Sequence, residues 1–427
     1  MADAASISLK LLDDLLGRDG RVGARLWDGT RWPDEQPRAA TLVLRHPGAL
    51  RSMFRAGTEL ALSEAYLYDD FDIEGDVESV FGLADSLAKR TAGWTRTLAA
   101  FSELGRLPKG GGQPRAAGRG PARLSGRPHS IERDREAIRY HYDVSNEFYR
   151  LFLDSRMVYS CGYFTDRNVG PDADVDAAQL AKLDLICRKL RLKPGQRLLD
   201  IGCGWGGLVM HAAERYGVDA TGITLSRPQV ELATERVAAA GLARSCRVRF
   251  LDYREVSEDR PFDALVSVGM FEHVGGAMLG DYFAKAARLL VRGGVFLNHG
   301  IASRVTDPYD TGPSFSNSYV FPDGETLPIH VALGAAEKAG FEVRDVESLR
   351  EHYAMTLRHW VRRLEAGHEQ ALRYVDEATY RVWRLYLSGS AHGFTSGRLN
   401  VYQALLALPD AHGASGLPLT REDWYRG

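Results

Sequence analysis

The sequence predicts an α/β fold in which a mostly parallel sheet carries helices on both faces, with a small α+β region before it. Two observations predict this class. From residue 131 onward, short apolar runs alternate with stretches of helical periodicity, a pattern typical of parallel strands joined by crossover helices. The chain also has 427 residues, more than one ordinary domain holds, so two or three domains are expected.

The first region, residues 1–104, is expected to mix helices and strands. Apolar residues recur at helical spacing over 7–16, and the run ATLVLR at 40–45 predicts a buried strand. The acidic and aromatic stretch 61–76 predicts a helix that ends in a turn at Gly75. The sequence leaves open whether this region contacts lipid or forms a homodimer.

Residues 105–130 are expected to form a mobile linker or a long loop. They contain seven glycines, four prolines and six basic residues, with no acidic residue. Such a segment buries too little apolar surface to offset the entropy lost on ordering. A solvated tether and a contact with anionic lipid headgroups both remain open for its charges. The expected parts are therefore 1–104, 105–130 and 131–427.

The third part supplies the strands and helices of the predicted sheet. Apolar runs predict strands at 197–202, 219–225, 247–253, 262–270 and 295–301, completed by 341–349 and 400–408. Helices are expected between them at 206–216, 228–241 and 279–291. The aromatic-rich stretch 350–395 also has helical periodicity.

Composition excludes several classes of protein. A formal charge of −2 gives no reason to expect nucleic acid as a partner. No apolar run approaches the roughly 20 residues that cross a bilayer, and the start of the chain lacks the basic region of a signal peptide. The four cysteines form no CxxC pair, so free thiols in a reducing cytoplasm are expected. No metal site is expected, because paired histidines at helical spacing are absent.

The strongest local motif is LLDIGCGWGGL at 198–208. Asp200 ends the first strand of the sheet, and Gly202, Gly204 and Gly207 match the GxGxxG pattern of dinucleotide sites. That pattern also requires an acidic residue at the end of the next strand, and none is present there. With Asp200, the motif instead resembles motif I of S-adenosylmethionine-dependent methyltransferases, in which the acid suits the ammonium group of the methionine moiety.

The ends of the next two strands complete a candidate cofactor site. Ser226 and Gln229 form an S-x-x-Q capping-box pattern with Pro228 in the first helical turn. Ligands of such sheets lie at the carboxyl ends of the strands. The residues expected near the ribose and the adenine are Thr224, Leu225, Gln229, Asp252 and Tyr253. The carboxylate of Asp252 could accept a hydrogen bond from the amino group of the adenine.

Seven blocks in order resemble the cyclopropane-fatty-acyl-phospholipid synthases and the related mycolic acid cyclopropane synthases. The blocks lie at 141–164, 198–208, 222–229, 266–275, 296–303, 352–360 and 386–394. The resemblance covers residues 131 to about 407, and residues 1–104 resemble more loosely the extra N-terminal domain of the phospholipid-acting members. It implies a class I methyltransferase-like (Rossmann-like) fold with a seven-stranded sheet.

The resemblance also implies the reaction. In that family, the methyl group of S-adenosylmethionine passes to a cis double bond of an unsaturated acyl chain, and the resulting carbocation loses a proton as a cyclopropane ring closes. Aromatic faces stabilise such a cation. The candidates for an aromatic wall are Tyr163, Phe164, Trp205, Phe315, Tyr319 and Phe394, each of which also suits an ordinary core.

A bound bicarbonate is implied as the base that takes the proton. The matching positions are Cys161, Glu272, His299 and Tyr353, with the backbone of Ile301. Tyr159 and Ser160 match positions that touch S-adenosylmethionine, so Cys161 beside them is expected to be a small wall residue and neither a nucleophile nor a redox thiol.

The sequence departs from the family at one position. Many members carry a cysteine where this chain has Ser390. The expected chemistry does not require a thiolate there, but the serine leaves the exact product open.

Three functions remain to be compared. The first is cyclopropanation of unsaturated phospholipids, for which a methylene or methyl-branched acyl chain is the close alternative. The others are a methyltransferase for a small polar acceptor and a non-catalytic lipid-binding protein. The first requires peripheral contact with an anionic membrane surface, helped by the basic residues of 105–130.

Overall fold

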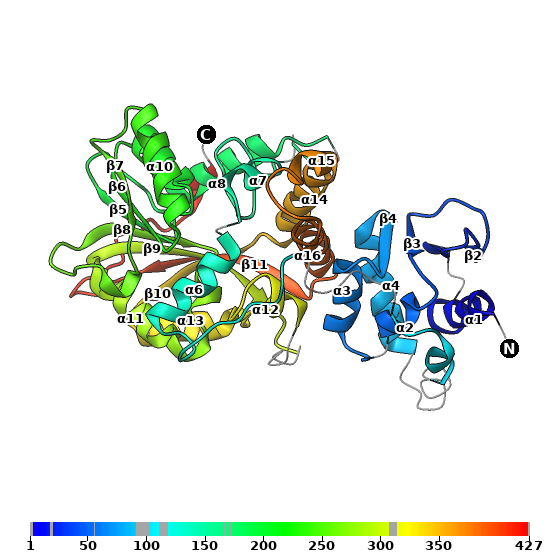
Figure 1. Ribbon diagram of the computed structural model, residues 1–427. Helices are drawn as coiled ribbons and strands as arrows, with labels where there is room; N and C mark the ends of the chain where they lie inside the picture. The colour runs from blue at the N-terminus through cyan, green and yellow to red at the C-terminus, as the bar shows by residue number, and fades with distance from the viewer. Residues whose placement is uncertain are drawn as a thin grey trace. The chain divides into compact units, whose positions relative to one another are not determined.

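The structure, a computed structural model, divides the chain into two compact units (Figure 1). The residues described are 3–17, 20–54, 56–90, 102–110, 118–142, 144–165, 168–170, 172–306 and 314–425. The first unit comprises Met1–Pro121, Asp310–Val320 and His368–His392, and the second comprises Ala122–Tyr309, Phe321–Gly367 and Gly393–Gly427. The N-terminal region is thus completed by two segments from late in the chain.

The first unit contains a four-stranded sheet in the order β2-β1-β3-β4. Its strands are β1 (Val22–Arg25), β2 (Arg31–Trp32), β3 (Ala40–Leu44) and β4 (Phe71–Gly75). Strands β1 and β3 are parallel, and the other pairs are antiparallel. Its helices are α1 (Ala4–Leu16), α2 (Ala49–Phe54), α3 (Glu59–Leu67), α4 (Val77–Arg90), α12 (Phe315–Tyr319), α15 (His368–Ala371) and most of α16 (Glu377–Thr395).

The expectation for 61–76 is wrong in part. Helix α3 ends at Leu67, and the residues before Gly75 form strand β4, which pairs antiparallel with β3. Phe71 and Ile73 are buried while Asp72 between them is half-buried. Buried and exposed residues alternate in this way along a strand that has one buried face. The acidic residues around Phe71 and Ile73 make this alternation hard to recognise in the sequence.

Buried ionic contacts join α16 to the rest of the first unit. Arg381 donates to the carbonyl oxygen of Tyr66 at 2.8 Å and pairs with Asp69 at 2.9 Å. The described start of the expected linker is also held here, because Arg51 donates to the carbonyl oxygens of Gly105 and Leu107. Residues 111–117 of that linker lie outside the described residues, and the division at 104 and 130 stays a prediction.

The second unit contains a seven-stranded sheet in the order β10-β11-β9-β8-β5-β6-β7. Its strands are β5 (Arg197–Ile201), β6 (Asp219–Thr224), β7 (Cys246–Phe250), β8 (Phe262–Val268), β9 (Leu290–Ser303), β10 (Glu342–Ser348) and β11 (Leu399–Ala407). Strands β5 to β9 pair in parallel, whereas β11 runs antiparallel to both β9 and β10. The predicted α/β class and the seven expected strands are confirmed.

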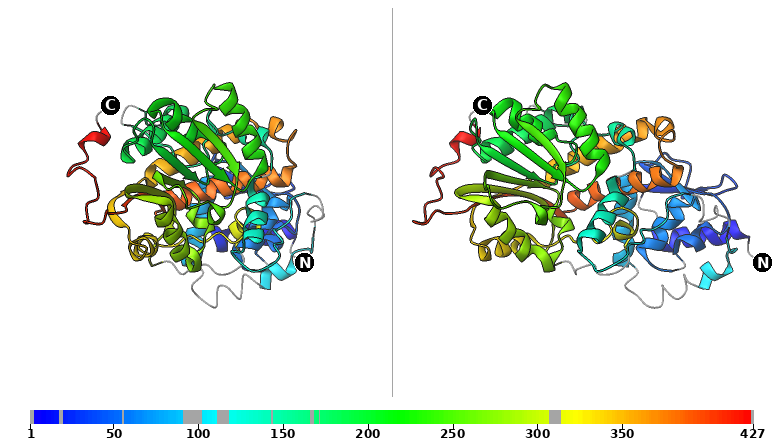
Figure 2. Two further views of the ribbon diagram at one scale, coloured as in Figure 1. Left: turned by 90° about the vertical axis from the view of Figure 1, so that its left-hand side faces the viewer. Right: turned by 60° about the vertical axis from the view of Figure 1, so that its left-hand side comes forward.

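Helices cover both faces of this sheet (Figure 2). They are α6 (Ile131–Tyr142), α7 (Asn146–Arg150), α8 (Val175–Lys189), α9 (Gly207–Tyr216), α10 (Arg227–Ala239), α11 (Leu279–Leu289), α13 (Ile329–Lys338), α14 (Arg350–Ala366) and α17 (Glu422–Tyr425). Leu198 packs with side chains of α8 and α9, whereas Leu199 packs with those of α11 and α13. Successive residues of a strand face opposite sides, so a run of apolar residues is what a doubly covered strand requires.

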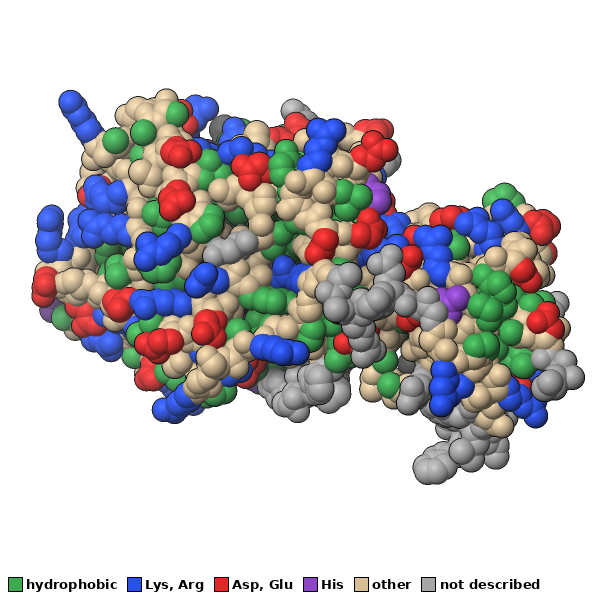
Figure 3. All heavy atoms as spheres, viewed as in Figure 1, with side chains coloured by type: hydrophobic (Ala, Val, Ile, Leu, Met, Phe, Trp, Pro, Cys, Tyr) green, Lys and Arg blue, Asp and Glu red, His purple; other side chains and the backbone are tan. Residues whose placement is uncertain are grey.

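Three further features bear on the expectations from composition. Acidic and basic side chains of the described residues are interspersed on the face drawn in Figure 3. Within the described part of the chain, no helix is both long enough and apolar enough to span a bilayer. All four cysteines are buried and free.

Candidate functional site

The glycine motif forms a turn between β5 and α9 at the carboxyl end of the sheet. Gly202 and Gly204 have φ angles of +84° and +55°, a backbone conformation that residues with a Cβ rarely adopt. A Cβ on Gly202 would also stand 3.1 Å from the side chain of Met270. The turn therefore brings backbone close to the loop after β8, and α9 begins directly behind it at Gly207.

One cavity in the second unit is lined by all ten residues that the sequence assigned to cofactor binding. They are Tyr159, Ser160, Asp200, Gly202, Gly204, Thr224, Leu225, Gln229, Asp252 and Tyr253. The cavity opens at the carboxyl ends of β5, β6 and β7, where ligands of parallel sheets lie. The structure thus brings these residues together, and their contact with a cofactor stays a prediction.

Asp200 is the buried acid of this cavity. It is 2% exposed, and no described residue donates a hydrogen bond to its Oδ1. Burial raises the pKa of its carboxyl to about 7, although the nearby ammonium of Lys182 acts in the opposite direction. A buried carboxylate without a donor is costly, so a ligand that presents an ammonium group would fit this position.

At the end of β6, the predicted cap forms only in part. Ser226 caps α10 by accepting from the backbone N–H of Gln229. The side chain of Gln229 turns the other way, and its Oε1 accepts from the hydroxyl of Thr224 at 2.6 Å. Gln229 and Thr224 thereby hold each other on the cavity wall.

Asp252 is engaged by a residue that the sequence interpretation did not consider. Its Oδ1 accepts from Nε of Arg254 at 2.8 Å, and its Oδ2 accepts from Nη2 at 2.6 Å. Arg254 also donates to Asp134 of α6 at 2.9 Å. Asp252 lines the cavity, but its acceptor capacity is largely used by this guanidinium, which weakens the expectation that it binds an adenine amino group.

A second group of polar side chains lies next to the glycine turn, at the end of β9. The backbone N–H of Ile301 donates to Oε1 of Glu272 at 2.7 Å. Ile301 is two residues from His299, and the carbonyl oxygen of His299 accepts from the N–H of Gly269 at 2.8 Å. Glu272 follows Met270, the residue that touches Gly202, so this group adjoins the cofactor cavity.

Two buried atoms in this group have no partner among the described residues. They are Oε2 of Glu272 and Nε2 of His299. Burial raises the pKa of Glu272 to about 7. Burial also lowers the pKa of His299 well below its usual value, and the positive charges of Lys182 and Lys189 act in the same direction. The histidine is therefore neutral at neutral pH.

The thiol of Cys161 and the backbone N–H of Tyr353 both contact the carbonyl oxygen of Leu349. The thiol of Cys161 lies 3.7 Å from the carbonyl oxygen of Leu349, which also accepts from the N–H of Tyr353 at 3.0 Å. The N–H of Leu349 donates to the carbonyl oxygen of Val401, the residue paired with Ile301 across β11 and β9. A series of contacts thus links the segments that carry the five residues expected to hold bicarbonate, two of them through the side chains of Cys161 and Glu272. That these five residues share one ligand stays a prediction.

Residues 129–404 match the model of the mycolic acid cyclopropane synthetase family. The "Probable fatty acid methyltransferase" of Pseudomonas putida is 41% identical over 405 residues, which cover 94% of this chain and 95% of that protein. The chain belongs to the mycolic acid cyclopropane synthetase family.

Further relatives agree on the chemistry of the family. The "Cyclopropane-fatty-acyl-phospholipid synthase" of Escherichia coli is 36% identical over 267 residues, 62% of this chain and 66% of that one. A solved structure of "mycolic acid cyclopropane synthase CmaA1 complexed with SAH and CTAB" superposes with a TM-score of 0.59 at 36% identity, over 64% of this chain and 97% of that one. The protein described here is thus an S-adenosylmethionine-dependent methyltransferase.

The six candidates for an aromatic wall are divided between the two units. Phe315 and Tyr319 belong to the first unit, as does Ser390 on α16. In the second unit, Tyr163 stacks on His352 with ring centroids 4.8 Å apart, and Phe394 packs on Tyr353 at 4.6 Å. The remaining two, Phe164 and Trp205, are buried, and only Trp205 lines the cofactor cavity.

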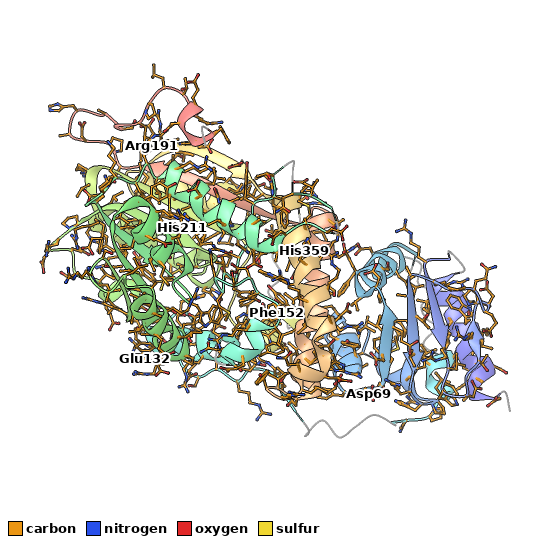
Figure 4. All side chains as sticks on the ribbon, turned by 90° about the horizontal axis from the view of Figure 1, so that it is seen from above. Asp69, Glu132, Phe152, Arg191, His211 and His359 are labelled. Atoms are coloured by element: carbon orange, nitrogen blue, oxygen red, sulfur yellow. The ribbon has the colours of Figure 1, made fainter. Side chains whose placement is uncertain are left out.

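A different set of rings surrounds Tyr159 in this methyltransferase. Its ring stacks on Trp360 at 5.3 Å and lies 5.7 Å from His141 and 5.5 Å from Tyr149. Phe152, labelled beside α14 in Figure 4, also packs on Trp360. The density of aromatic residues in 141–164 is the sequence signal that could have identified this cluster.

The structure allows a prediction about the thiols. Burial raises the pKa of all four cysteines, that of Cys246 to about 11 and those of the others further. Because the thiolate is the reactive form, iodoacetamide at pH 7 is expected to leave methyl transfer unchanged, measured as initial rate after incubation. Rapid inactivation that the Cys161→Ala variant escapes would show instead that Cys161 is a reactive thiol.

Proposed function

We propose that this methyltransferase alkylates the cis double bond of an unsaturated phospholipid acyl chain and closes it to a cyclopropane ring, with a bound bicarbonate accepting the released proton. The observation that supports this most directly is that two buried atoms beside the cavity, Oε2 of Glu272 and Nε2 of His299, have no hydrogen-bond partner among the described residues. Buried polar atoms are rarely left without hydrogen bonds, so a small polar ion in this position accounts for both.

The residues at the glycine turn suit the methyl donor. When bound, S-adenosylmethionine supplies an electrophilic methyl group on a sulfonium. Asp200 would hold its ammonium group, and the backbone at Gly202 and Gly204 would allow close approach. Thr224 and Gln229, which already position each other, would face its ribose.

The acyl chain then needs a cavity without water and a base. The alkene carbon that gains the methyl group leaves its neighbour cationic, and the ring closes when the added carbon loses a proton. Aromatic faces stabilise positive charge without reacting with it, a role that Tyr159 and Trp360 can fill. Water would trap the cation as an alcohol, so burial of the site is part of its chemistry.

The polar group at the end of β9 would hold the bicarbonate and pass on the proton. A pKa of about 7 suits Glu272 for accepting a proton and returning it to solvent at neutral pH. Cys161 remains a thiol because burial raises its pKa, so its role in the proposal is that of a small neutral wall residue. Tyr353, which shares the Leu349 carbonyl group with it, completes the set.

A methylene or methyl-branched acyl chain is the second candidate product. It is supported by the relative from Pseudomonas putida, which is named "Probable fatty acid methyltransferase" and matches 94% of the chain. Ser390 leaves the exact product open. Proton loss from a different carbon would distinguish this route. The contact of Glu272 with the N–H of Ile301, two residues after His299 on β9, supports ring closure, because it fixes one carboxyl group where it could act with the proposed bicarbonate as the base.

The products distinguish these candidates. The enzyme would be incubated with S-adenosylmethionine and vesicles of an unsaturated phospholipid, and the lipids analysed by mass spectrometry and proton NMR. A gain of one CH₂ with ring-proton signals supports the proposal. Olefinic methylene or branched methyl signals would favour the second candidate, and activity only on soluble amines or catechols would reject both.

Contact with the membrane surface is part of the proposal, since the double bonds lie inside a bilayer. Sedimentation with vesicles containing anionic lipid is expected to pellet the protein at low salt and less of it at high salt, because each basic residue near such a surface contributes about 1 kcal/mol. Neutral vesicles are the control. Equal binding at both salt concentrations would remove the electrostatic part of the proposal.

A further inference from the structure

Three residues form a row across the sheet behind the proposed bicarbonate site. Glu347 of β10 is paired in register with Gln403 of β11, and Gln403 is paired with His299 of β9. Directly opposite residues on paired strands project from the same face. Lys189, the last residue of α8, reaches this row from the helix layer: its ammonium pairs with Glu347 and donates to Oε1 of Gln403 at 2.8 Å.

The row continues from Gln403 to the histidine. Nε2 of Gln403 lies 3.2 Å from Nδ1 of His299. Lys189 and Gln403 are both 0% exposed, and His299 is 2% exposed. The contacts are thus shielded from water, so their donors and acceptors must match one another.

The ammonium of Lys189 fixes the direction of every hydrogen bond in the row. An ammonium has donors and no acceptor, so the amide oxygen of Gln403 must face Lys189. The amide NH₂ of Gln403 then faces His299 and can only donate. Nδ1 of His299 is therefore the acceptor, and a neutral imidazole that accepts at Nδ1 carries its proton on Nε2.

We infer that Lys189 and Gln403 are positioning residues that hold His299 as the Nε2–H tautomer, a hydrogen-bond donor and not a base. The other ring nitrogen is Nε2, which is buried and has no hydrogen-bond partner among the described residues. A donor there suits an oxygen of an anion. This inference rests on the proposed function for the identity of that anion, and it assigns proton acceptance to the anion and Glu272 alone.

The C-terminal segment closes the row on its outer side. The ring of Trp424 lies 5.5 Å from Nζ of Lys189 and 5.4 Å from the guanidinium of Arg191. Arg191 pairs with Asp423 at 2.7 Å, and Figure 4 shows it beside the C-terminal segment. Trp424 is itself buried. This cover keeps water from competing for Lys189, which would otherwise loosen the orientation of Gln403.

The test is the tautomer of His299, read by NMR on the full-length protein labelled with ¹⁵N-histidine. The signals are assigned by their loss in the His299→Gln variant. Two-bond couplings distinguish the nitrogens, because Nε2 couples to both ring protons and Nδ1 to only one. The wild-type protein is expected to show a protonated Nε2 and an unprotonated Nδ1. A protonated Nδ1 in the wild-type protein would overturn the inference without any variant.

The Gln403→Glu variant tests whether the amide of Gln403 sets the tautomer of His299. A carboxylate accepts where the amide donated, so His299 is expected to gain a proton at Nδ1, and kcat to fall at least tenfold while KM for S-adenosylmethionine stays within about twofold. Asn400→Asp, the same change of amide to acid on the same strand, should leave the His299 signals and kcat unchanged. An unchanged tautomer in a folded Gln403→Glu variant would contradict the inference.

These readouts separate the inference from the proposed function. The NMR measurement needs neither substrate nor bicarbonate. If His299 responds as expected while removal of bicarbonate leaves turnover unchanged, then the positioning role stands and the proposed base is wrong.

Discussion

Replacing Glu272 by glutamine is expected to lower kcat by roughly 10²–10⁴-fold, the range that general acid–base catalysis contributes. The amide oxygen of glutamine can still accept from the N–H of Ile301, as Oε1 of Glu272 does at 2.7 Å. The variant therefore keeps the shape of the site and loses only the group that can take up a proton. Initial rates with phospholipid vesicles at saturating S-adenosylmethionine would measure the effect.

The specificity of that loss can be checked in two ways. KM for S-adenosylmethionine should change little, since Glu272 does not line the cofactor cavity. Glu337→Gln, the same substitution at an exposed position of α13, should leave kcat unchanged. Turnover of the Glu272→Gln variant within about twofold of wild type would show that the carboxyl group takes no part in proton transfer.

Replacing Asp200 by asparagine is expected to weaken binding of S-adenosylmethionine by roughly 10- to 100-fold. A hydrogen bond to a charged group contributes about 1.5–3 kcal/mol, and each 1.4 kcal/mol is about tenfold in affinity. Calorimetric titration of the cofactor measures this directly. Asp219→Asn is a matched control, because Asp219 begins β6 at the amino end of the sheet, away from the cavity.

The same carboxyl group predicts a pH dependence of cofactor affinity. The pKa of Asp200 is raised to about 7 by burial, and only its ionised form attracts an ammonium group. Affinity should therefore increase as the pH rises through 7, by roughly eightfold between pH 6 and pH 7.5, with a proton released on binding. Asp200→Asn should abolish this dependence. A flat profile in the wild-type protein would show that Asp200 does not contact the ammonium group.

Cofactor affinity should rise with pH, whereas the contribution of the buried acids Asp200 and Glu272 to the free energy of unfolding should fall as the pH rises. Burial raises the folded-state pKa of both Asp200 and Glu272 to about 7. Their protonated forms are thus favoured in the folded state, so each contributes stability at low pH that is lost as the pH rises toward 7. A bound ammonium group on Asp200 would reverse its contribution, which is one physical reason for a ligand at this position.

The sequence predicted the cofactor cavity well because its parts are local. Tyr159 and Ser160, which precede β5, were assigned from the family resemblance. Asp200, Gly202 and Gly204 lie within five residues of one another, and the other predicted residues stand at or soon after the carboxyl ends of β6 and β7, which reach the same edge of the sheet. Parallel pairing alone then brings them together. Lys182 was missed because it lies on α8 among residues whose burial depends on how that helix packs, and a lysine in a helix normally faces water.

Contacts between strands were the hardest to foresee. Gln403 and His299 are 104 residues apart in sequence and meet only because β11 runs antiparallel to β9 in one register. A shift of one residue would place Gln403 on the other face. Likewise, Arg254 was not considered, because its bond to Asp134, 120 residues away in sequence, depends on the packing of α6.

The central claim is that an alkene is alkylated and that the added carbon then loses a proton to a base held by Glu272 and His299. Deuterium labelling of the transferred methyl group tests this claim most directly. The enzyme would be supplied with S-adenosylmethionine carrying a CD₃ group and with vesicles of an unsaturated phospholipid. The account predicts an acyl chain with a cyclopropane ring whose new carbon retains two deuterium atoms. An intact CD₃ branch on the acyl chain, or label in a soluble acceptor alone, would contradict it.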